Sequence, residues 1–220
     1  MVNSNKRKLA LCGYLKENHP EIYESPLKVQ KFLFFYECFA KIANETHDFS
    51  NLKGYKQGPV FSTVYGDYTK ERKDFNKAIS SAYHSKTENL NEKIQEQCAF
   101  LCGTMTEEEI SKITHEMWIW KKQEKRIMNG ETQVPLNESD FNESDTKLIK
   151  DLADMCPIDR IENTRIINIG AKYFVFNEID AKRITETHLD TLTKLEETNR
   201  DDLYNPVYVS IDKKGVLIID

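Results

Sequence analysis

The sequence predicts a mainly α protein, with a compact helical domain around one buried central helix and a small C-terminal α+β appendage that contains β-hairpins. Three observations lead to this fold class. The stretch 25–44 is apolar over most of the circumference of a helix. Glycine (8) and proline (6) are few, which disfavours a turn-rich all-β fold. Strand-like segments gather only after Arg165, so we divide the chain into a helical domain at 1–133 and an α+β extension at 134–220.

The central helix is expected to begin at Ser25, whose hydroxyl can accept a hydrogen bond from the first turn as an N-cap. Pro26 follows at the first helical position, where a missing N–H leaves no partner unpaired. No further proline or glycine occurs before Gly54, so the helix can extend to Asn44. Its polar side chains fall on one narrow stripe, formed by Gln30, Glu37, Lys41 and Asn44. Because the rest of its surface is apolar, we expect other helices to enclose it.

Lys31 breaks this pattern, because it lies on the apolar side beside Phe35 and Cys38. In one interpretation its methylenes pack while the ammonium reaches solvent past the first turn, which is the commoner arrangement. In the other, a buried carboxylate or carbonyl groups hold the ammonium in a fixed polar site. The residues of this helix leave both interpretations open.

Helical periodicity also predicts helices over 6–18, 74–83, 88–102 and 144–155. A capping box at Thr106–Glu109 begins a further helix with one apolar stripe, made of Ile110, Ile113, Met117 and Trp120. Gly58-Pro59 is expected to end a turn and open another helix, in which Val60, Val64 and Tyr68 share a face. Residues 121–136 are expected to form a loop.

The last quarter of the chain changes to an alternating pattern. We expect strands at 165–169 and 172–176, separated by Gly170-Ala171, and a hairpin of 207–211 with 216–219. Between them, Asp180 is expected to cap a helix that carries Ile184, His188, Leu192 and Leu195 on one side. These elements define the predicted α+β appendage.

Composition excludes several classes of protein. The net charge of −5 argues against a general nucleic-acid binder. The five cysteines lack CxxC spacing, so we expect reduced core thiols rather than disulfides or a zinc site. The basic start at 6–8 is followed by too short an apolar run for a signal peptide, and no stretch reaches transmembrane length. These features predict a cytoplasmic protein with no membrane partner.

The sequence offers no catalytic constellation, and we expect neither an enzyme nor a metal or other cofactor. His115-Glu116 begins like a zinc-protease motif, but Trp120 stands where the second histidine is needed. No phosphate-binding glycine loop and no GxSxG motif occurs. Glu178, Asp180 and Lys182 could imitate a nuclease metal site, although a helix cap and a solvated lysine are the better explanation.

A basic cluster follows the two tryptophans Trp118 and Trp120, and it consists of Lys121, Lys122, Lys125 and Arg126. Such a cluster could contact phosphates while an indole stacks on a base. More often it is a solvated helix end whose cations complement the helix dipole. A DNA-binding or phage-associated regulatory protein is therefore the alternative functional hypothesis.

Three segments, in this order, resemble the Panacea (SocA-like) antitoxin domain family. They are Leu27-Lys-Val-Gln-Lys-Phe-Leu-Phe-Phe-Tyr36, Tyr55-Lys-Gln-Gly-Pro-Val-Phe-Ser-Thr-Val-Tyr65 and Ile110-Ser-Lys-Ile-Thr-His-Glu-Met-Trp-Ile-Trp120. They are similar to the family patterns KLQKLLYYA, YGPVxxxVY and LSxLTHxExxW. Val29 and Gln57 depart from the family pattern, and the segment after Val134 has no counterpart in it.

The resemblance implies an antitoxin that neutralises a cognate protein toxin by direct binding, with the toxin encoded next door. One branch of the family serves as a protease adaptor, so a protease is a further implied partner. The expected partner-binding residues or polar nest are Gln30, Lys31, Gly58, Pro59, Val60, Tyr65, Thr114, His115, Trp118 and Trp120. The polar members would either fix helix packing or contact the partner. Phe61 and the two tryptophans are candidate partner anchors, unless they belong to the core.

Overall fold

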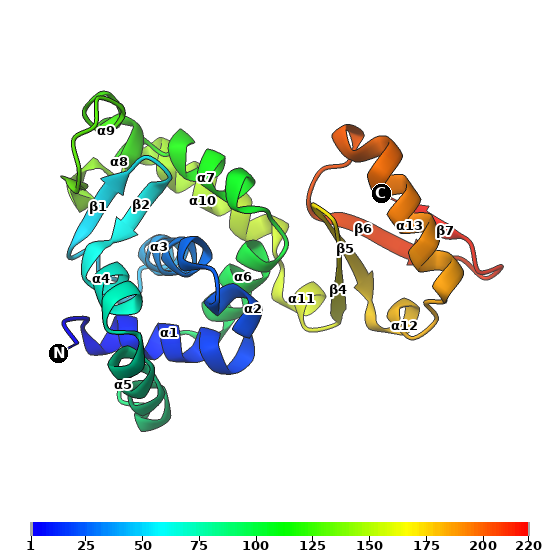
Figure 1. The fold of residues 1–220 in the computed structure, drawn as a ribbon, viewed down its shortest axis with the longest axis horizontal. Helices are drawn as coiled ribbons and strands as arrows, with labels where there is room; N and C mark the ends of the chain where they lie inside the picture. The colour runs from blue at the N-terminus through cyan, green and yellow to red at the C-terminus, as the bar shows by residue number, and fades with distance from the viewer. Residues whose placement is uncertain (1, 220) are drawn as a thin grey trace. The chain divides into compact units, whose positions relative to one another are not determined.

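The computed structural model describes residues 2–219 and confirms that the chain is mainly α (Figure 1). The chain divides into two compact units. One holds the chain up to Gly103 together with Glu107–Met155, and the other holds Thr104–Thr106 with the chain from Cys156 onward. This boundary differs from the expected one at 133/134. The reason is that α10 (Glu143–Met155) packs against α3 (Pro26–Ile42) and therefore belongs to the first unit.

The first unit contains most of the helices. Besides α3 and α10 they are α1 (Lys6–Asn18), α2 (Pro20–Tyr23), α4 (Ser62–Lys70), α5 (Arg72–Ser85), α6 (Glu92–Gly103), α7 (Glu107–Glu116), α8 (Trp118–Lys121), α9 (Glu124–Met128) and a 3₁₀ turn at Glu138–Asp140. In Figure 1, α3 is seen nearly end-on with other elements of its unit around it. Every residue of α3 from Val29 to Ala40 is buried, and Ser25 Oγ caps it by accepting from the Lys28 N–H. The polar stripe is covered only in part, because Gln30 and Glu37 are buried, whereas Lys41 is half-buried and Asn44 is exposed beyond the end of the helix at Ile42.

A small antiparallel sheet lies beside α3 in the order β2-β1-β3, from β1 (Leu52–Tyr55), β2 (Gly58–Phe61) and β3 (Val134–Pro135). The prediction that Pro59 opens a helix is wrong. Val60 pairs with Lys53 in the sheet, and helix α4 begins only at Ser62. The side chain of Gln30 stabilises the strand, because its Oε1 accepts the Phe61 N–H at 2.8 Å.

The helix expected from Thr106 to Trp120 is interrupted at Met117, between α7 and α8. Asp145 of α10 causes the interruption, because its carboxylate accepts the backbone N–H groups of Trp118 and Ile119. These are the free N–H groups of a helix start, which a carboxylate stabilises. The expected loop at 121–136 likewise contains α9 and β3.

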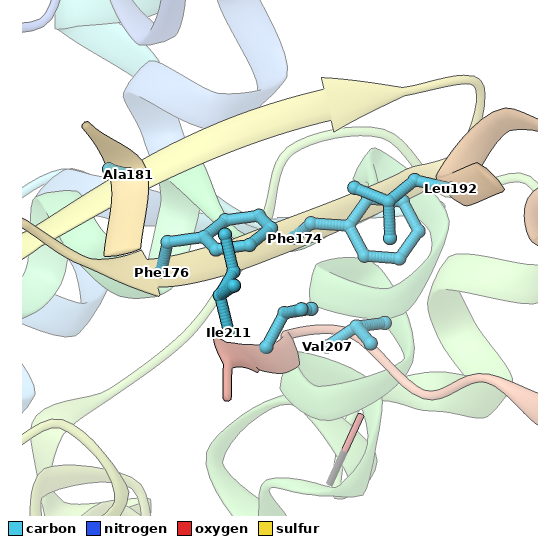
Figure 2. Close-up of a cluster of buried hydrophobic side chains, with 7 residues drawn as sticks. Phe174, Phe176, Ala181, Leu192, Val207 and Ile211 are labelled. Carbon is cyan, nitrogen blue, oxygen red and sulfur yellow. The ribbon is translucent and has the colours of Figure 1, made fainter. Parts of the chain in front are cut away.

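The second unit is built on a four-stranded sheet in the order β4-β5-β6-β7, from β4 (Thr164–Ile169), β5 (Lys172–Asn177), β6 (Val207–Ile211) and β7 (Leu217–Ile219). The β5–β6 pair is parallel and the other two pairs are antiparallel. Its helices are α11 (Ile158–Ile161), α12 (Glu178–Ala181), α13 (Glu186–Asn199) and a 3₁₀ turn at Arg200–Asp202. Figure 2 shows the core of this unit, in which Phe174 and Phe176 of β5 belong to one buried cluster with Leu192 of α13 and Ile211 of β6.

The helix predicted to begin at Asp180 is two helices. Asn177 caps α12, and Thr185 caps α13 in a capping box with His188. Asp180 therefore lies inside α12, where its carboxylate accepts from the Ile211 N–H of β6 and from Arg183. Its role is to join the helix to the sheet.

The five cysteines are buried as thiols. Among residues 2–219, no helix combines the length and the apolar character that crossing a membrane requires.

Candidate functional site

Lys31 of α3 is the meeting point of three segments that lie far apart in the sequence. Its Nζ donates to the carbonyl oxygen of Gln57, in the turn between β1 and β2. It also donates to Oγ1 of Thr114 in α7, at 3.0 Å. Only 1% of Lys31 is exposed, so the ammonium is held in a fixed polar site and does not extend into solvent.

Gly58 is placed directly over this ammonium. Its φ of +104° is a conformation that side chains with a Cβ rarely adopt. A Cβ at this position would lie 2.1 Å from Lys31 Nζ and 2.5 Å from Thr114 Oγ1. The turn can therefore approach Lys31 this closely only with glycine at position 58.

The other residues expected in the polar nest lie close to Lys31, and each has a different structural role. Gln30 holds the edge of β2 through the Phe61 N–H. The His115 ring stacks on Trp120, with centroids 4.0 Å apart. Trp120 is buried and donates its Nε1–H to the Tyr55 carbonyl at 3.0 Å. Phe61 and Trp120 therefore belong to the core, which rules them out as exposed anchors.

A hollow of 710 Å³ lies over this site. Five of the expected residues line it, namely Gln30, Lys31, Pro59, Val60 and Tyr65. The rest of the lining includes Leu27 of α3, Tyr55 of β1 and Ile127 of α9, which makes it largely apolar. Tyr65 is 41% exposed, and its ring centroid lies 6.3 Å from that of Tyr55. Concave, mostly apolar surfaces of this size with a few placed polar groups are typical binding sites.

Trp118 is the one candidate aromatic residue that is both exposed, at 44%, and absent from the lining of the hollow.

No family model, no curated protein and no solved structure matches this chain. Its function therefore has to be inferred from the chemistry of its own residues.

The electrostatics of the site are dominated by an ammonium without a counter-ion. Burial lowers the pKa of Lys31 to about 7, and only the nearby Cys102 opposes the shift. Burial also lowers the pKa of His115, and the charge of Lys31 adds to this shift. Among the described residues, no carboxylate pairs with Lys31, whose hydrogen-bond partners are a carbonyl and a hydroxyl. Such a site favours an anionic ligand group and disfavours a second cation.

The lowered pKa predicts a specific pH dependence of stability. Between pH 7 and 10.5 the unfolded chain binds more protons at Lys31 than the folded chain does, so this contribution to stability increases as the pH rises. We expect the wild type to gain about 2 kcal/mol relative to Lys31→Met between pH 7 and pH 9. Urea unfolding of both proteins at pH 7, 8 and 9 measures this. The comparison cancels the titration of cysteines and tyrosines, which both proteins share.

Lys112→Met is a matched control, because Lys112 is exposed on α7 and pairs with Glu108 one turn earlier on the same helix. Its stability should follow that of the wild type across this range. Parallel pH curves for the wild type and Lys31→Met would show that Lys31 is not held in the poorly hydrated site described here.

The basic cluster is largely neutralised by acidic neighbours. Lys121 pairs with Glu116 at 3.0 Å and Lys122 with Asp140 at 2.6 Å, and Arg126 forms two hydrogen bonds with Glu131. Lys125 is the fourth member. Cations that already have carboxylate partners are less available to phosphates, so this arrangement does not favour nucleic-acid binding.

The residues considered for a nuclease site also have structural tasks. Asp180 joins α12 to β6, while Glu178 lies 3.7 Å from the exposed Lys182. Among residues 2–219, no group of three or more His, Cys, Asp and Glu side chains is placed to hold a metal ion.

One polar cluster was not predicted. Glu37 of α3 is fully buried and accepts from Arg7 and Lys8 of α1 and from the Asp48 N–H. Burial lowers the pKa of Lys8, although Glu37 opposes the shift. The sequence placed Glu37 on a polar stripe, and the basic residues at 6–8 were the only signal that a partner existed. This cluster anchors α1 to α3.

Proposed function

We propose that this chain belongs to the Panacea (SocA-like) antitoxin domain family and is an antitoxin that neutralises a cognate protein toxin by direct binding. The observation that supports this best is the convergence of the three motif segments on one residue. Lys31 comes from the first segment, Gln57 and Gly58 from the second, and Thr114 from the third. A binding site shared by a family is expected to bring motif residues that are distant in sequence together beneath one hollow.

The chemistry of the site supports recognition rather than bond-breaking. The polar groups around Lys31 are a carbonyl, a hydroxyl and the uncharged ring of His115 stacked on Trp120. The exposed lining of the hollow above them is mostly apolar and includes aromatic side chains, and large aromatic residues are frequent in the energetic centres of protein interfaces. In this proposal α3 is the central helix of the toxin-binding unit, and the second unit is an appendage to it.

Expression beside the neighbouring gene tests the proposal. We expect the product of that gene to arrest growth when it is expressed alone, and co-expression of this chain to restore growth. The two proteins should copurify as a stable complex, because neutralisation is by direct contact. The readouts are colony counts with each gene under its own inducer, and size-exclusion chromatography of the tagged complex.

The control is a chain with the hollow obstructed, Val60→Arg, which places a long cation on the lining. This variant should fold and fail to restore growth. The proposed function is wrong if the two wild-type proteins neither bind each other nor restore growth.

A further inference from the structure

We propose that the hollow above Lys31 receives a segment of the partner toxin that carries one Asp or Glu side chain flanked by apolar residues, and that this carboxylate pairs with the Lys31 ammonium. The choice of a protein as the ligand rests on the proposed antitoxin function. The choice of an acidic, otherwise apolar segment rests on the site itself.

The first reason to expect an acidic residue in the ligand is the charge of the site. An ammonium that leaves water normally has a carboxylate partner, because a buried unpaired charge is strongly unfavourable. Lys31 is 1% exposed, and among residues 2–219 its ammonium has a carbonyl and a hydroxyl as hydrogen-bond partners. A carboxylate brought by a ligand would supply the missing counter-ion. In this poorly hydrated setting, Lys31 would also bind a carboxylate much more tightly than a neutral amide.

The acidic residues already present do not fill this role. Glu107 lines the hollow, but its carboxylate accepts the hydroxyl of Ser25 at 2.6 Å. Glu131 also lines it and is paired with Arg126. Both are therefore engaged elsewhere on the rim, and neither is a counter-ion for Lys31, which also lines the hollow.

The shape and lining of the hollow are the reason to expect apolar residues beside the acidic one. Its volume of 710 Å³ far exceeds that of a single carboxylate, so the ligand must fill it with other groups. The residues that would contact those groups include Leu27, Pro59, Val60 and Ile127. An apolar stretch on either side of the acidic residue fits such a surface, whereas a strongly acidic peptide or a nucleic-acid backbone does not.

The test uses the full chain and short random peptides displayed on phage. Peptides are selected on the wild type after subtraction on Lys31→Met, and the enriched sequences are synthesised with Glu or Asp and with the matching amide. We expect enrichment of one acidic position between apolar residues. We also expect about tenfold or greater loss of affinity when the acid becomes an amide, or when Lys31 becomes Met or Gln. The two losses should not add, because each removes the same ion pair.

Lys31→Gln retains a hydrogen-bond donor and serves if Lys31→Met unfolds. Lys112→Met is the matched control and should bind the peptides as the wild type does. The inference is overturned if no peptides are enriched, if the enriched peptides share no acidic position, or if Lys31→Met and Lys31→Gln bind them unchanged. A free small carboxylate such as acetate should compete only weakly, and competition equal to that of the peptide would also overturn it.

A second arm separates this inference from the proposed function. The growth assay with the neighbouring toxin is repeated with Lys31→Met, which should fail to restore growth. If the wild type itself fails to restore growth, the antitoxin function is refuted while the peptide selection still decides the chemistry of the hollow. If the wild type and Lys31→Met restore growth equally, the antitoxin function stands and the role of Lys31 is refuted.

Discussion

Replacement of Gly58 by alanine is expected to lower the free energy of unfolding by about 3 kcal/mol or more and to abolish binding in the hollow. Two effects combine. The φ of +104° is unfavourable for alanine, and the new Cβ would collide with Lys31 Nζ and Thr114 Oγ1. Either the turn between β1 and β2 or the Lys31 side chain would have to shift, so the hydrogen bond between Lys31 and the Gln57 carbonyl would be lost as well. Urea unfolding at pH 7 measures the loss of stability.

Two other glycines separate these effects. Gly66 lies in α4, where an added Cβ would meet no atom within 4 Å and φ is ordinary, so Gly66→Ala should be neutral or stabilise by up to about 1 kcal/mol. Gly130 has a φ of +92° but also no neighbour within 4 Å of an added Cβ, so Gly130→Ala should show backbone strain alone, about 1 kcal/mol. A Gly58→Ala protein no less stable than Gly130→Ala would contradict the close approach to Lys31.

Glu37→Gln is expected to destabilise the first unit by about 3–5 kcal/mol, because removing one partner from a buried ionic cluster leaves the others uncompensated. Arg7 and Lys8 would remain between α1 and α3 without a carboxylate between them. The amide would also offer donors where the Asp48 N–H and both cations require acceptors. Thermal and urea unfolding, together with proteolysis of the N-terminal segment, measure this effect.

Glu138→Gln is the matched control for an exposed carboxylate. Glu138 pairs with Lys41 at 2.6 Å and with His47 at 2.9 Å, but its side chain is 43% exposed. Its replacement should change stability by less than about 1 kcal/mol. Equal losses for the two variants would mean that the cluster around Glu37 is no more buried than a surface ion pair.

Elements that depend on local signals were predictable from the sequence. Ser25 and Pro26 determine the start of α3, and the helical period of α10 is visible without any partner. Elements that depend on distant partners were not. Residues 58–61 form a strand because they pair with β1, although Pro59 is equally compatible with a helix start.

The break at Met117 has the same origin, because its cause, Asp145, lies far along the chain, 27 residues beyond Trp118. The candidate site shows the same contrast between what local signals predict and what depends on distant partners. The resemblance of three motifs brought Lys31, Gly58 and Thr114 together as candidates, whereas the burial of Trp120 and the exposure of Trp118 depend on the path of α7 and α8. Glu37 was overlooked because a polar stripe on a helix does not reveal whether water or another helix faces it.

The outer edge of β2 has a consequence for any bound chain. In an antiparallel pair, alternate residues direct their backbone groups away from the neighbouring strand. On β2, Pro59 has no N–H to offer, and the Phe61 N–H is already taken by Gln30. The lack of these two donors disfavours extension of the sheet by β-augmentation at this edge, which also protects it from edge-to-edge aggregation. A guest peptide must be selected by its side chains, so its specificity is decided by sequence rather than by main-chain pairing.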